Sequence, residues 1–402
     1  MVIFGSHEEL VLEQGGEKTK IKANRIYCST DNDIKHYAQV VGDQTGESIF
    51  FYFSKEDISK ARPHFPVHLG QQEDGDVVDN ILLTQLRALI TTNGNALNLA
   101  VMGGLGAGLG DSIVGLETMR NMLAILAEQG LAKLSINVFI RQRDYRRLRS
   151  LYSRFEFINS VKTLPIPMDQ FKEYHGYWDV APHFNTSRFD VMPMQDFYLE
   201  TLGVAPDEIE SNKKEPKGMD INQGAKKSVK FRLSSVGRPV LLFHPKSTTM
   251  LRDMPRGYML QLLDCVLAAT NYSVITLSDI DYVHPRFFNL SRYSQTFDDY
   301  CAFIASADAI ISVDTSIYHI AAGYRIPTLA IFSTIPPDLR GRYYPTIQTV
   351  LLPGAEQASF YKKHVHHKDT AEQQRQLDEV EALWRRLEID DVVNRLKKMI
   401  TS

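Results

Sequence analysis

Polar side chains that directly follow an apolar run are the clearest chemical signal in this 402-residue chain, and the strongest instance is Ile310–Ala322. The apolar run stops at Asp314, Thr315 and Ser316, and a segment with helical spacing begins at once. Hydroxyls, free backbone N–H groups and the positive end of a helix dipole together bind phosphate. His319 follows Thr315 by four residues, which is one helical turn on the same face. The pattern predicts a diphosphate site, with a structural role as the alternative for His319.

A second segment of this kind follows an apolar run further upstream. It contains His244, Lys246, Ser247, Thr248 and Arg252. Hydroxyls combined with two cationic side chains suit a diphosphate. The alternative is an ordinary solvated loop.

A third loop, Ser333–Pro345, is stiffened by prolines, carries two arginines and again follows an apolar run. If the three runs are strands of one parallel sheet, the loops after them meet at one edge of that sheet. We therefore expect them to converge on an anion.

A glycine-rich turn at Gly103–Ser112 lies between a predicted strand and a predicted helix. It fails the dinucleotide fingerprint G-x-G-x-x-G, because Leu109 and Asp111 stand where the last glycine is needed. What remains is a turn almost without side chains that lets another molecule approach and presents Asp111 at its end. The alternative is that Asp111 only caps the helix. The residues of this loop predicted to lie beside the approaching molecule are Gly108, Gly110 and Ser112.

Weaker signals have simple alternatives. Asp279-Ile280-Asp281 looks like a metal-binding pair but fits a solvated loop, and His364, His366 and His367 fit an exposed loop without nearby cysteine. The aromatic cluster Tyr174–Asp179 could stack on a sugar or simply pack in a core. We expect no metal site.

Composition excludes several classes of function. The formal net charge is −3 and the pI is near 6.5, so nothing in the whole-chain charge attracts nucleic acid or anionic lipid, and any anion site must be local. Three distant cysteines form no disulfide framework, which favours a reducing, cytoplasmic setting. No apolar run approaches the roughly 20 residues that span a bilayer, so we expect membrane contact to be peripheral at most.

Alternating strands and helices must position these loops. Leu97–Met102 and Leu134–Ile140 predict strands on either side of a helix at Ile113–Gln129. A polar stretch, Asp207–Lys227, predicts a linker. Five further strands are predicted after it, at Pro239–Phe243, Ser273–Leu277, Ala309–Val313, Thr328–Phe332 and Ile347–Leu352, and a helix at Thr370–Met399.

These elements predict an α/β protein of three domains. Residues 1–92 form a small β-rich accessory domain, residues 93–228 a Rossmann-like domain with the linker, and residues 229–402 a second Rossmann-like domain with the final helix. Ligands of open parallel sheets bind at the carboxyl ends of the strands. The expected site is therefore a cleft between the two α/β domains.

Val313–Ala322 and Ile326–Phe332 resemble the Asp-Thr-x-x-x-His-x-Ala segment of the ADP-heptose:lipopolysaccharide heptosyltransferases, family 9 glycosyltransferases of the two-Rossmann GT-B class. Gly110-Asp111-Ser112 is similar to the family's N-terminal Gly-Asp loop, whose Asp is taken as the catalytic base. Ser247, Thr248 and Arg252 resemble a hydroxyl pair and a lysine, with Arg in place of Lys.

The resemblance covers roughly residues 96–350. It implies that residues 93–228 form the acceptor domain and residues 229–402 the nucleotide-sugar-binding domain. The first 90 residues have no counterpart in the lipopolysaccharide enzymes and are more similar to the extension of related heptosyltransferases that modify autotransporter adhesins. Those relatives carry a cysteine-ligated iron site, whereas this chain has no cysteine after Cys301.

The resemblance implies an inverting glycosyltransferase that moves a sugar, a heptose, from an ADP-linked donor to a hydroxyl of a glycolipid or protein. Asp111 takes the acceptor proton, and the donor residues stabilise the leaving diphosphate. No cofactor beyond the nucleotide-sugar donor, no metal and no nucleic acid is expected. The alternatives are a nucleotide-sugar isomerase of GT-B-like fold and a non-catalytic nucleotide-sugar-binding protein.

Overall fold

The computed structural model of the chain describes residues 2–6, 10–14, 17–23, 25–30, 50–52, 65–70, 81–106, 108–131, 133–362 and 370–401. The chain divides into two compact units. Unit 1 consists of Met1–Phe189 and Gln195–Lys214, and unit 2 of Asp190–Met194 and Glu215–Ser402. Residues 1–92 fall inside unit 1. A separate accessory domain and a domain boundary at residue 228 both remain predictions.

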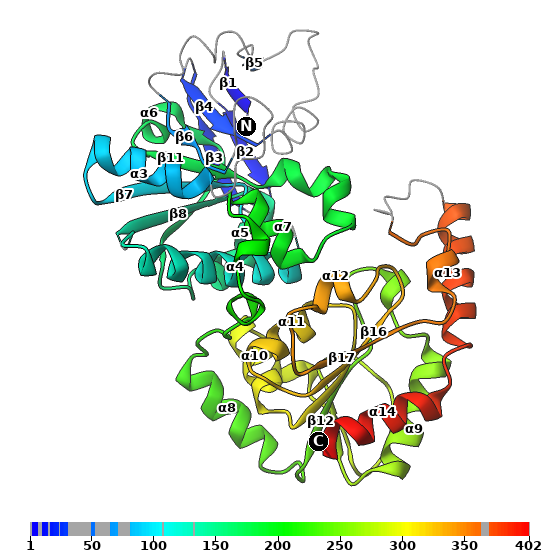
Figure 1. Ribbon diagram of the computed structural model, residues 1–402. Helices are drawn as coiled ribbons and strands as arrows, with labels where there is room; N and C mark the ends of the chain where they lie inside the picture. Colours follow the sequence, from blue (N-terminus) through cyan, green and yellow to red (C-terminus); the bar gives the residue numbers. More distant parts are fainter. Residues whose placement is uncertain are drawn as a thin grey trace. The chain divides into compact units, whose positions relative to one another are not determined.

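Unit 1 contains a five-stranded parallel sheet (Figure 1). In spatial order its strands are β6 (Val67–His68), β11 (Gly176–Asp179), β7 (Leu97–Met102), β8 (Leu134–Ile140) and β9 (Ile158–Thr163). β7 and β8 are mostly apolar and largely buried, as expected for central strands of a covered parallel sheet. In this sheet β8, the next strand along the chain, lies on one side of β7, and the later strand β11 lies on the other side of β7. The loops after β7 and β11 therefore meet at one edge.

Helices and short 3₁₀ turns connect these strands. The helices are α3 (Ile81–Asn93), α4 (Leu109–Glu128), α5 (Gln142–Tyr152), α6 (Met168–Phe171) and α7 (Met194–Thr201). The 3₁₀ turns are η2 (Ala181–Asn185), η3 (Ser187–Asp190), η4 (Pro206–Glu208) and η5 (Ser211–Lys214). The predicted linker thus begins with short turns rather than an extended strand.

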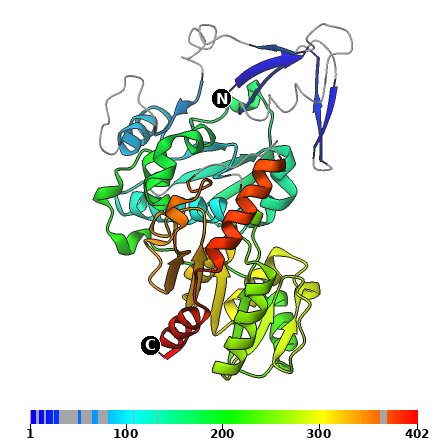
Figure 2. The same cartoon turned by 90° about the vertical axis from the view of Figure 1, so that its right-hand side faces the viewer.

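The N-terminal region is β-rich, as predicted (Figure 2, blue strands). Its antiparallel sheet has the order β10-β4-β1-β5, and β2 pairs with β3 as a hairpin. These strands are β1 (Val2–Ser6), β2 (Leu10–Gln14), β3 (Glu17–Ile21), β4 (Ile26–Ser29), β5 (Phe50–Tyr52) and β10 (Ile166–Pro167). The polar, glycine-containing segments Gly15-Gly16, Gly42-Asp43 and Asp74–Asp76 lie outside the described residues.

The N-terminal sheet shares a hydrophobic core with the parallel sheet of unit 1. Buried Ile3 and Cys28 belong to the same cluster as Met102 of β7 and Phe139 of β8. Because β10 comes from the α/β part of the chain and pairs with β4, the sheet is completed by both segments.

Unit 2 contains a six-stranded parallel sheet. In spatial order its strands are β14 (Phe287–Asn289), β13 (Ser273–Thr276), β12 (Val240–His244), β15 (Ala309–Val313), β16 (Thr328–Phe332) and β17 (Ile347–Leu351). Numbered along the chain within the unit, the order is 3-2-1-4-5-6, the doubly wound arrangement of dinucleotide-binding folds. The order reverses between β12 and β15, so the loops after these two strands meet.

The helices of unit 2 flank this sheet (Figures 1 and 2). They are α8 (Gln223–Leu233), α9 (Arg256–Ala269), α10 (Phe297–Ser306), α11 (Ser316–Gly323), α12 (Asp338–Gly341), α13 (Thr370–Trp384) and α14 (Ile389–Thr401), with 3₁₀ turns η6 (Met250–Arg252), η7 (Ser291–Tyr293) and η8 (Ala355–Gln357). The main core of unit 2 joins β12, β15 and β16 to α9, α13 and α14, with Trp384 buried inside it.

The predicted single helix at Thr370–Met399 is wrong. α13 ends at Trp384 and α14 begins at Ile389. Asp390 and Asp391 lie in the first turn of α14, where carboxylates stabilise the positive end of a helix. The acidic pair therefore favours a new helix start at this point.

Candidate functional site

The loops after β12 and β15 lie together at the point where the strand order of unit 2 reverses. The Ser247 hydroxyl donates a hydrogen bond to the Asp314 carbonyl oxygen at 3.1 Å. This contact joins two segments that are 67 residues apart in the sequence. The predicted meeting of the two loops is therefore present in unit 2.

Asp314 pairs with groups of unit 2 and is buried. Its carboxylate accepts a hydrogen bond from the Tyr318 hydroxyl at 3.2 Å and lies 3.4 Å from Arg252 Nη1. Arg252 is partly exposed, and its Nε is buried without a hydrogen-bond partner in the described part of the chain. Asp314 thus positions Arg252, while its own predicted contact with a donor remains a prediction.

The N-terminus of α11 has the features of an anion site. Its capping residue Thr315 is extended and makes no side-chain capping bond, and the first turn contains no acidic residue. Thr315 and Ser316 are half-buried, and Ser316 contacts the Tyr300 hydroxyl. The first-turn N–H groups of a helix have no partner within the helix, so they can bind an anion together with the positive dipole.

His319 is buried and neutral. Its Nδ1 lies 2.7 Å from the hydroxyl of Tyr344, which lies beyond the neighbouring strand β16. Burial, reinforced by the positive charges of Arg340 and Arg252, lowers the pKa of His319 to about 3. His319 can therefore offer a hydrogen bond but carries no positive charge near neutral pH.

His244, the last residue of β12, is the second neutral histidine of this edge. Burial lowers its pKa to about 4, and its Nδ1 lies 3.5 Å from the Ser278 hydroxyl in the loop after β13. Its predicted role in binding a donor is untested by this geometry.

Lys246 and Thr248 are exposed at the surface of the loop after β12. Asp253 closes this loop by accepting hydrogen bonds from the Ser247 N–H at 2.7 Å and from Lys246 Nζ at 3.0 Å. The loop is therefore internally braced.

The third predicted loop, after β16, also joins the other two. The Ser333 hydroxyl donates to the Leu251 carbonyl at 2.7 Å, and buried Arg340 acts electrostatically on His319. Sequence reasoning gave no role to Tyr300, Tyr318 or Tyr344. Two of these tyrosines stood inside quoted motifs, but the sequence did not reveal which partners they bind.

Asp111 lies in the first turn of α4, at the carboxyl edge of the unit 1 sheet. Its Oδ2 accepts the Gly108 N–H at 3.2 Å, so it does cap the helix, yet its side chain remains partly exposed. This cap starts α4 at Leu109, four residues before the predicted start at Ile113. The predicted loop residues Gly108, Gly110 and Ser112 all lie in this first turn or next to it.

The glycine-rich turn is required by backbone geometry and by close packing. Gly103, Gly104 and Gly106 have φ values of 80°, 77° and 111°, which side chains strongly disfavour. A Cβ at Gly106 would lie 2.5 Å from the Asp111 Cβ. A Cβ at Gly103 would lie 2.9 Å from the Thr30 methyl group, so the N-terminal region touches this turn.

Asp179, the last residue of the aromatic cluster, and His183, to which the sequence gave no role, share this edge of unit 1. Asp179 ends β11 in register with Met102 of β7, and both residues are buried. Burial lowers the pKa of nearby His183, while Asp179 acts in the opposite direction.

The structure also places the residues of the weaker sequence signals. Tyr174, Tyr177 and Trp178 are buried, and the Trp178 indole N–H donates to the Leu202 carbonyl, so the aromatic cluster packs in unit 1. Asp279 and Asp281 are exposed, and the described residues contain no metal-binding cluster. His364, His366 and His367 lie outside the described residues.

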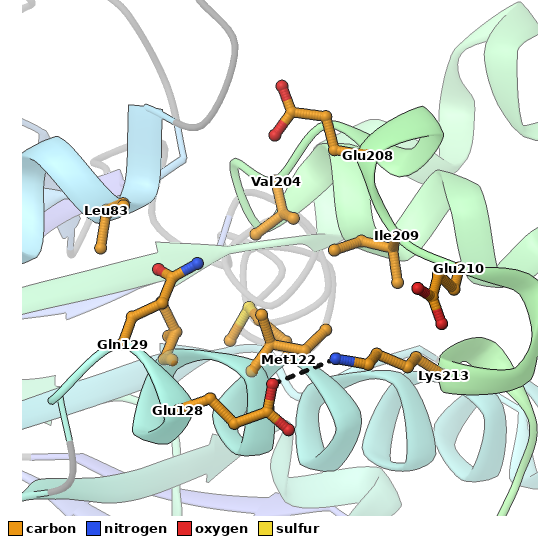
Figure 3. Close-up of a pocket in the computed structure, with 11 residues that line it drawn as sticks. Leu83, Met122, Glu128, Gln129, Val204, Glu208, Ile209, Glu210 and Lys213 are labelled. Atoms are coloured by element: carbon orange, nitrogen blue, oxygen red, sulfur yellow. Dashed lines mark hydrogen bonds and ion pairs between the residues drawn. The ribbon is translucent and has the colours of Figure 1, made fainter.

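A surface cavity of about 240 Å³ lies in unit 1, and its lining differs from the predicted site residues (Figure 3). Leu83 of α3, Met122 of α4 and Ile209 form part of its apolar wall, and Glu128 pairs with Lys213 at its rim at 3.0 Å. It contains none of the predicted site residues.

Comparison with known proteins bears on the site in unit 2. Residues 295–369 match the family model described as Glycosyltransferase family 9 (heptosyltransferase). The matched segment contains β15, the N-terminus of α11, His319, Arg340 and Tyr344. This segment of the chain is similar to glycosyltransferase family 9. A search of curated proteins found no match.

Several solved structures are similar to this chain. A glycosyl transferase family 9 protein from Veillonella parvula DSM 2008 is 11% identical with a TM-score of 0.53, covering 76% of this chain and 97% of that one. E. coli ADP-heptose lps heptosyltransferase II is 16% identical with a TM-score of 0.47, and the match covers 72% of this chain and 98% of that one. Iron-containing dodecameric heptosyltransferase TibC of E. coli, in complex with ADP-D-beta-D-heptose, is 16% identical with a TM-score of 0.46. That match covers 76% of this chain and 79% of TibC. Two units with parallel sheets, as predicted, agree with the GT-B fold.

No helix in the described part of the chain is both long and apolar enough to cross a bilayer.

Proposed function

We propose that this protein is a glycosyltransferase, which transfers a heptose, with inversion, from an ADP-linked donor to a hydroxyl of a glycolipid or protein acceptor. The observation that supports it most is the arrangement in unit 2. There, the loop carrying Ser247 and Arg252 meets the open N-terminus of α11 where the strand order reverses. Two similar solved structures were described with ADP-heptose in their names, which favours this donor.

Charge development on the leaving group explains the residue types. When the bond to the sugar breaks, the nucleoside diphosphate gains negative charge, and donors fixed in advance lower the barrier. In this proposal Arg252 and Lys246 supply positive charge, and Ser247, Thr248 and the N–H groups at Thr315 and Ser316 supply hydrogen bonds. His319 adds a neutral hydrogen bond rather than a charge, because burial lowers its pKa to about 3.

The proposal assigns proton removal from the acceptor to Asp111. A carboxylate at the start of α4 is held by the Gly108 N–H yet partly exposed, so it can accept a proton from a hydroxyl.

Donor identity is tested by ligand stabilisation followed by transfer. We expect ADP and ADP-heptose to raise the melting temperature of the protein, and GDP and UDP to do so less, because binding to the folded state stabilises it by mass action. Equal stabilisation by all three nucleotides contradicts the ADP assignment. A shift with UDP alone contradicts it as well.

Asp111→Asn tests the base, because the amide keeps the shape of the side chain and removes its basicity. We expect transfer to fall by roughly 10²–10⁴-fold with donor affinity unchanged. Asp281→Asn, at an exposed position in unit 2, is the matched control and keeps wild-type transfer. Unchanged transfer in Asp111→Asn removes this residue from the mechanism.

Incubation with ADP-heptose alone distinguishes the transferase from a nucleotide-sugar isomerase. The proposal predicts only slow hydrolysis of the donor. An epimerised sugar nucleotide in the product mixture supports the isomerase, and intact donor together with no transfer to any glycolipid or protein tried supports a binding protein.

A further inference from the structure

Helix α8 carries a concentrated positive charge that the proposed reaction does not use. No Asp or Glu occurs between Asp220 and Asp253, whereas α8 itself contains Lys226, Lys227, Lys230 and Arg232. The chain as a whole has a net charge of −3, so this surface is a local exception. Such a charge attracts polyanions within about a Debye length, roughly 10 Å at 0.1 M salt.

The side chains of α8 are segregated between core and solvent. Val229 and Leu233 are buried and fix the helix in unit 2, where it lies beside α10 on the outside of the unit (Figure 1). At about 100° per residue, Phe231 points away from these two anchors. Phe231 is 72% exposed.

An aromatic ring held outward beside lysines is unusual for a surface that faces only water. Lys227 precedes Phe231 by four residues and lies on the same face of the helix, and exposed Lys230 and Lys226 lie further round on one side of the ring. None of the three lysines forms an ion pair with another residue in the part of the chain that the structure describes. Their charge is therefore available to an external anion.

A second segment continues the basic surface. The guanidinium carbon of Arg232 lies 4.2 Å from the centre of the Tyr293 ring, and that of Arg292 lies 4.7 Å from the same ring. Cation–π contacts on this ring hold both arginines beside α8. The surface formed by Lys226, Lys227, Lys230, Phe231, Arg232, Arg292 and Tyr293 is called the α8 surface below.

Helix α5, which is rich in arginine, lacks the unpaired lysines and the exposed aromatic ring of α8. Arg141 and Arg147 pair with Asp144 at 2.7 and 2.9 Å, and Arg149 lies over the Tyr145 ring. It also presents no large apolar side chain among the exposed residues of the described chain. Three arginines at this helix thus share Asp144 as a partner within unit 1, whereas none of the α8 lysines forms an ion pair in the described chain.

We propose that the α8 surface docks this protein on anionic lipid bilayers. Lysines near a negatively charged leaflet each contribute attraction, and an exposed aromatic ring inserts at the level of the headgroups. The apolar anchors Val229 and Leu233 stay in the core, so α8 lies along the membrane as part of a folded unit and does not span it. The inference does not depend on the donor or on the reaction.

Vesicle sedimentation of the full-length protein tests the proposal. We expect binding to vesicles that contain phosphatidylglycerol, little binding to pure phosphatidylcholine vesicles, and loss of binding in about 1 M NaCl. Lys226→Gln/Lys227→Gln/Lys230→Gln should weaken binding roughly a hundredfold, from the attraction of three lysines. Phe231→Ser should weaken it roughly tenfold, because partial insertion of a phenyl ring is lost. All these residues are exposed, so melting temperatures should match that of the wild type.

Lys397→Gln/Lys398→Gln, with two exposed lysines on α14, is the control for a general change in charge and should bind as the wild type does. Equal binding by the triple α8 variant and the wild type overturns the proposal. So does wild-type protein that fails to sediment with phosphatidylglycerol vesicles. Binding to a soluble polyanion such as heparin that depends on the lysines, with no effect of Phe231→Ser on vesicle binding, overturns it in favour of a nucleic-acid or polysaccharide surface.

Discussion

The two buried histidines of unit 2 make its stability depend on pH in a way that can be calculated. The pKa is about 3 for His319 and about 4 for His244, against 6.5 for a free histidine. Because both folded-state values are depressed, the unfolded chain binds more protons between these values and pH 6.5. The stability contributed by the neutral histidines is therefore complete above about pH 6.5 and is lost as the pH falls.

The size of the effect follows from 1.36 kcal/mol per pKa unit. Between about pH 7.5 and about pH 5, each histidine should reduce the free energy of unfolding by about 2 kcal/mol. The wild type should lose about 4 kcal/mol from the pair. His319→Asn keeps an acceptor for the Tyr344 hydroxyl but does not titrate, so it should lose only about 2 kcal/mol over the same range.

The assay is urea unfolding at the two pH values, with tryptophan fluorescence as the signal that reports unfolding. The chain has two tryptophans, Trp178 in unit 1 and Trp384 in unit 2, so a Trp178→Phe background reports unit 2 alone. His244→Asn provides the matched comparison and should also remove about half of the dependence. If His319→Asn loses as much stability as the parent between the two pH values, His319 is not the buried neutral group described here.

Three further substitutions test the packing of the two sheet edges. Gly106→Ala should destabilise unit 1 by about 2 kcal/mol or more and reduce transfer, because φ is 111° and the new Cβ would meet Asp111; wild-type stability and activity would contradict the described turn. Tyr344→Phe should cost about 1–3 kcal/mol in urea unfolding and weaken ADP binding, because His319 Nδ1 loses its hydroxyl partner; an unchanged ADP affinity would separate His319 from the donor. Asp314→Asn should lower the melting temperature, because it leaves Arg252 and Tyr318 without their anionic partner, and an unchanged melting temperature would argue against this network.

Much of the α/β framework could be predicted from the sequence. Leu97–Met102, Leu134–Ile140, Ala309–Val313 and Thr328–Phe332 were predicted with the observed bounds, because buried parallel strands are short, nearly continuous apolar runs. The short strand Phe287–Asn289 was not predicted. It is a three-residue edge strand, and so few residues show no periodicity.

The site was predictable where it depends on a strand end and not where it depends on a partner from elsewhere in the chain. Asp314, Thr315 and Ser316 follow β15 directly, so their place at the sheet edge follows from the strand. The burial of His319 does not, because its partner Tyr344 is 25 residues away and reaches it through the fold. In the same way, the sequence could not show that Asp314 faces Arg252.

The most direct measurement of the central claim is calorimetric titration of ADP into wild-type protein and Arg252→Gln. The account predicts binding to the wild type and a loss of roughly 10- to 150-fold in affinity for Arg252→Gln, the range expected for one charged hydrogen-bonding partner. Arg395→Gln, which breaks an exposed ion pair on α14, should bind ADP as the wild type does. Equal affinity in wild type and Arg252→Gln would contradict a diphosphate site between the loops after β12 and β15.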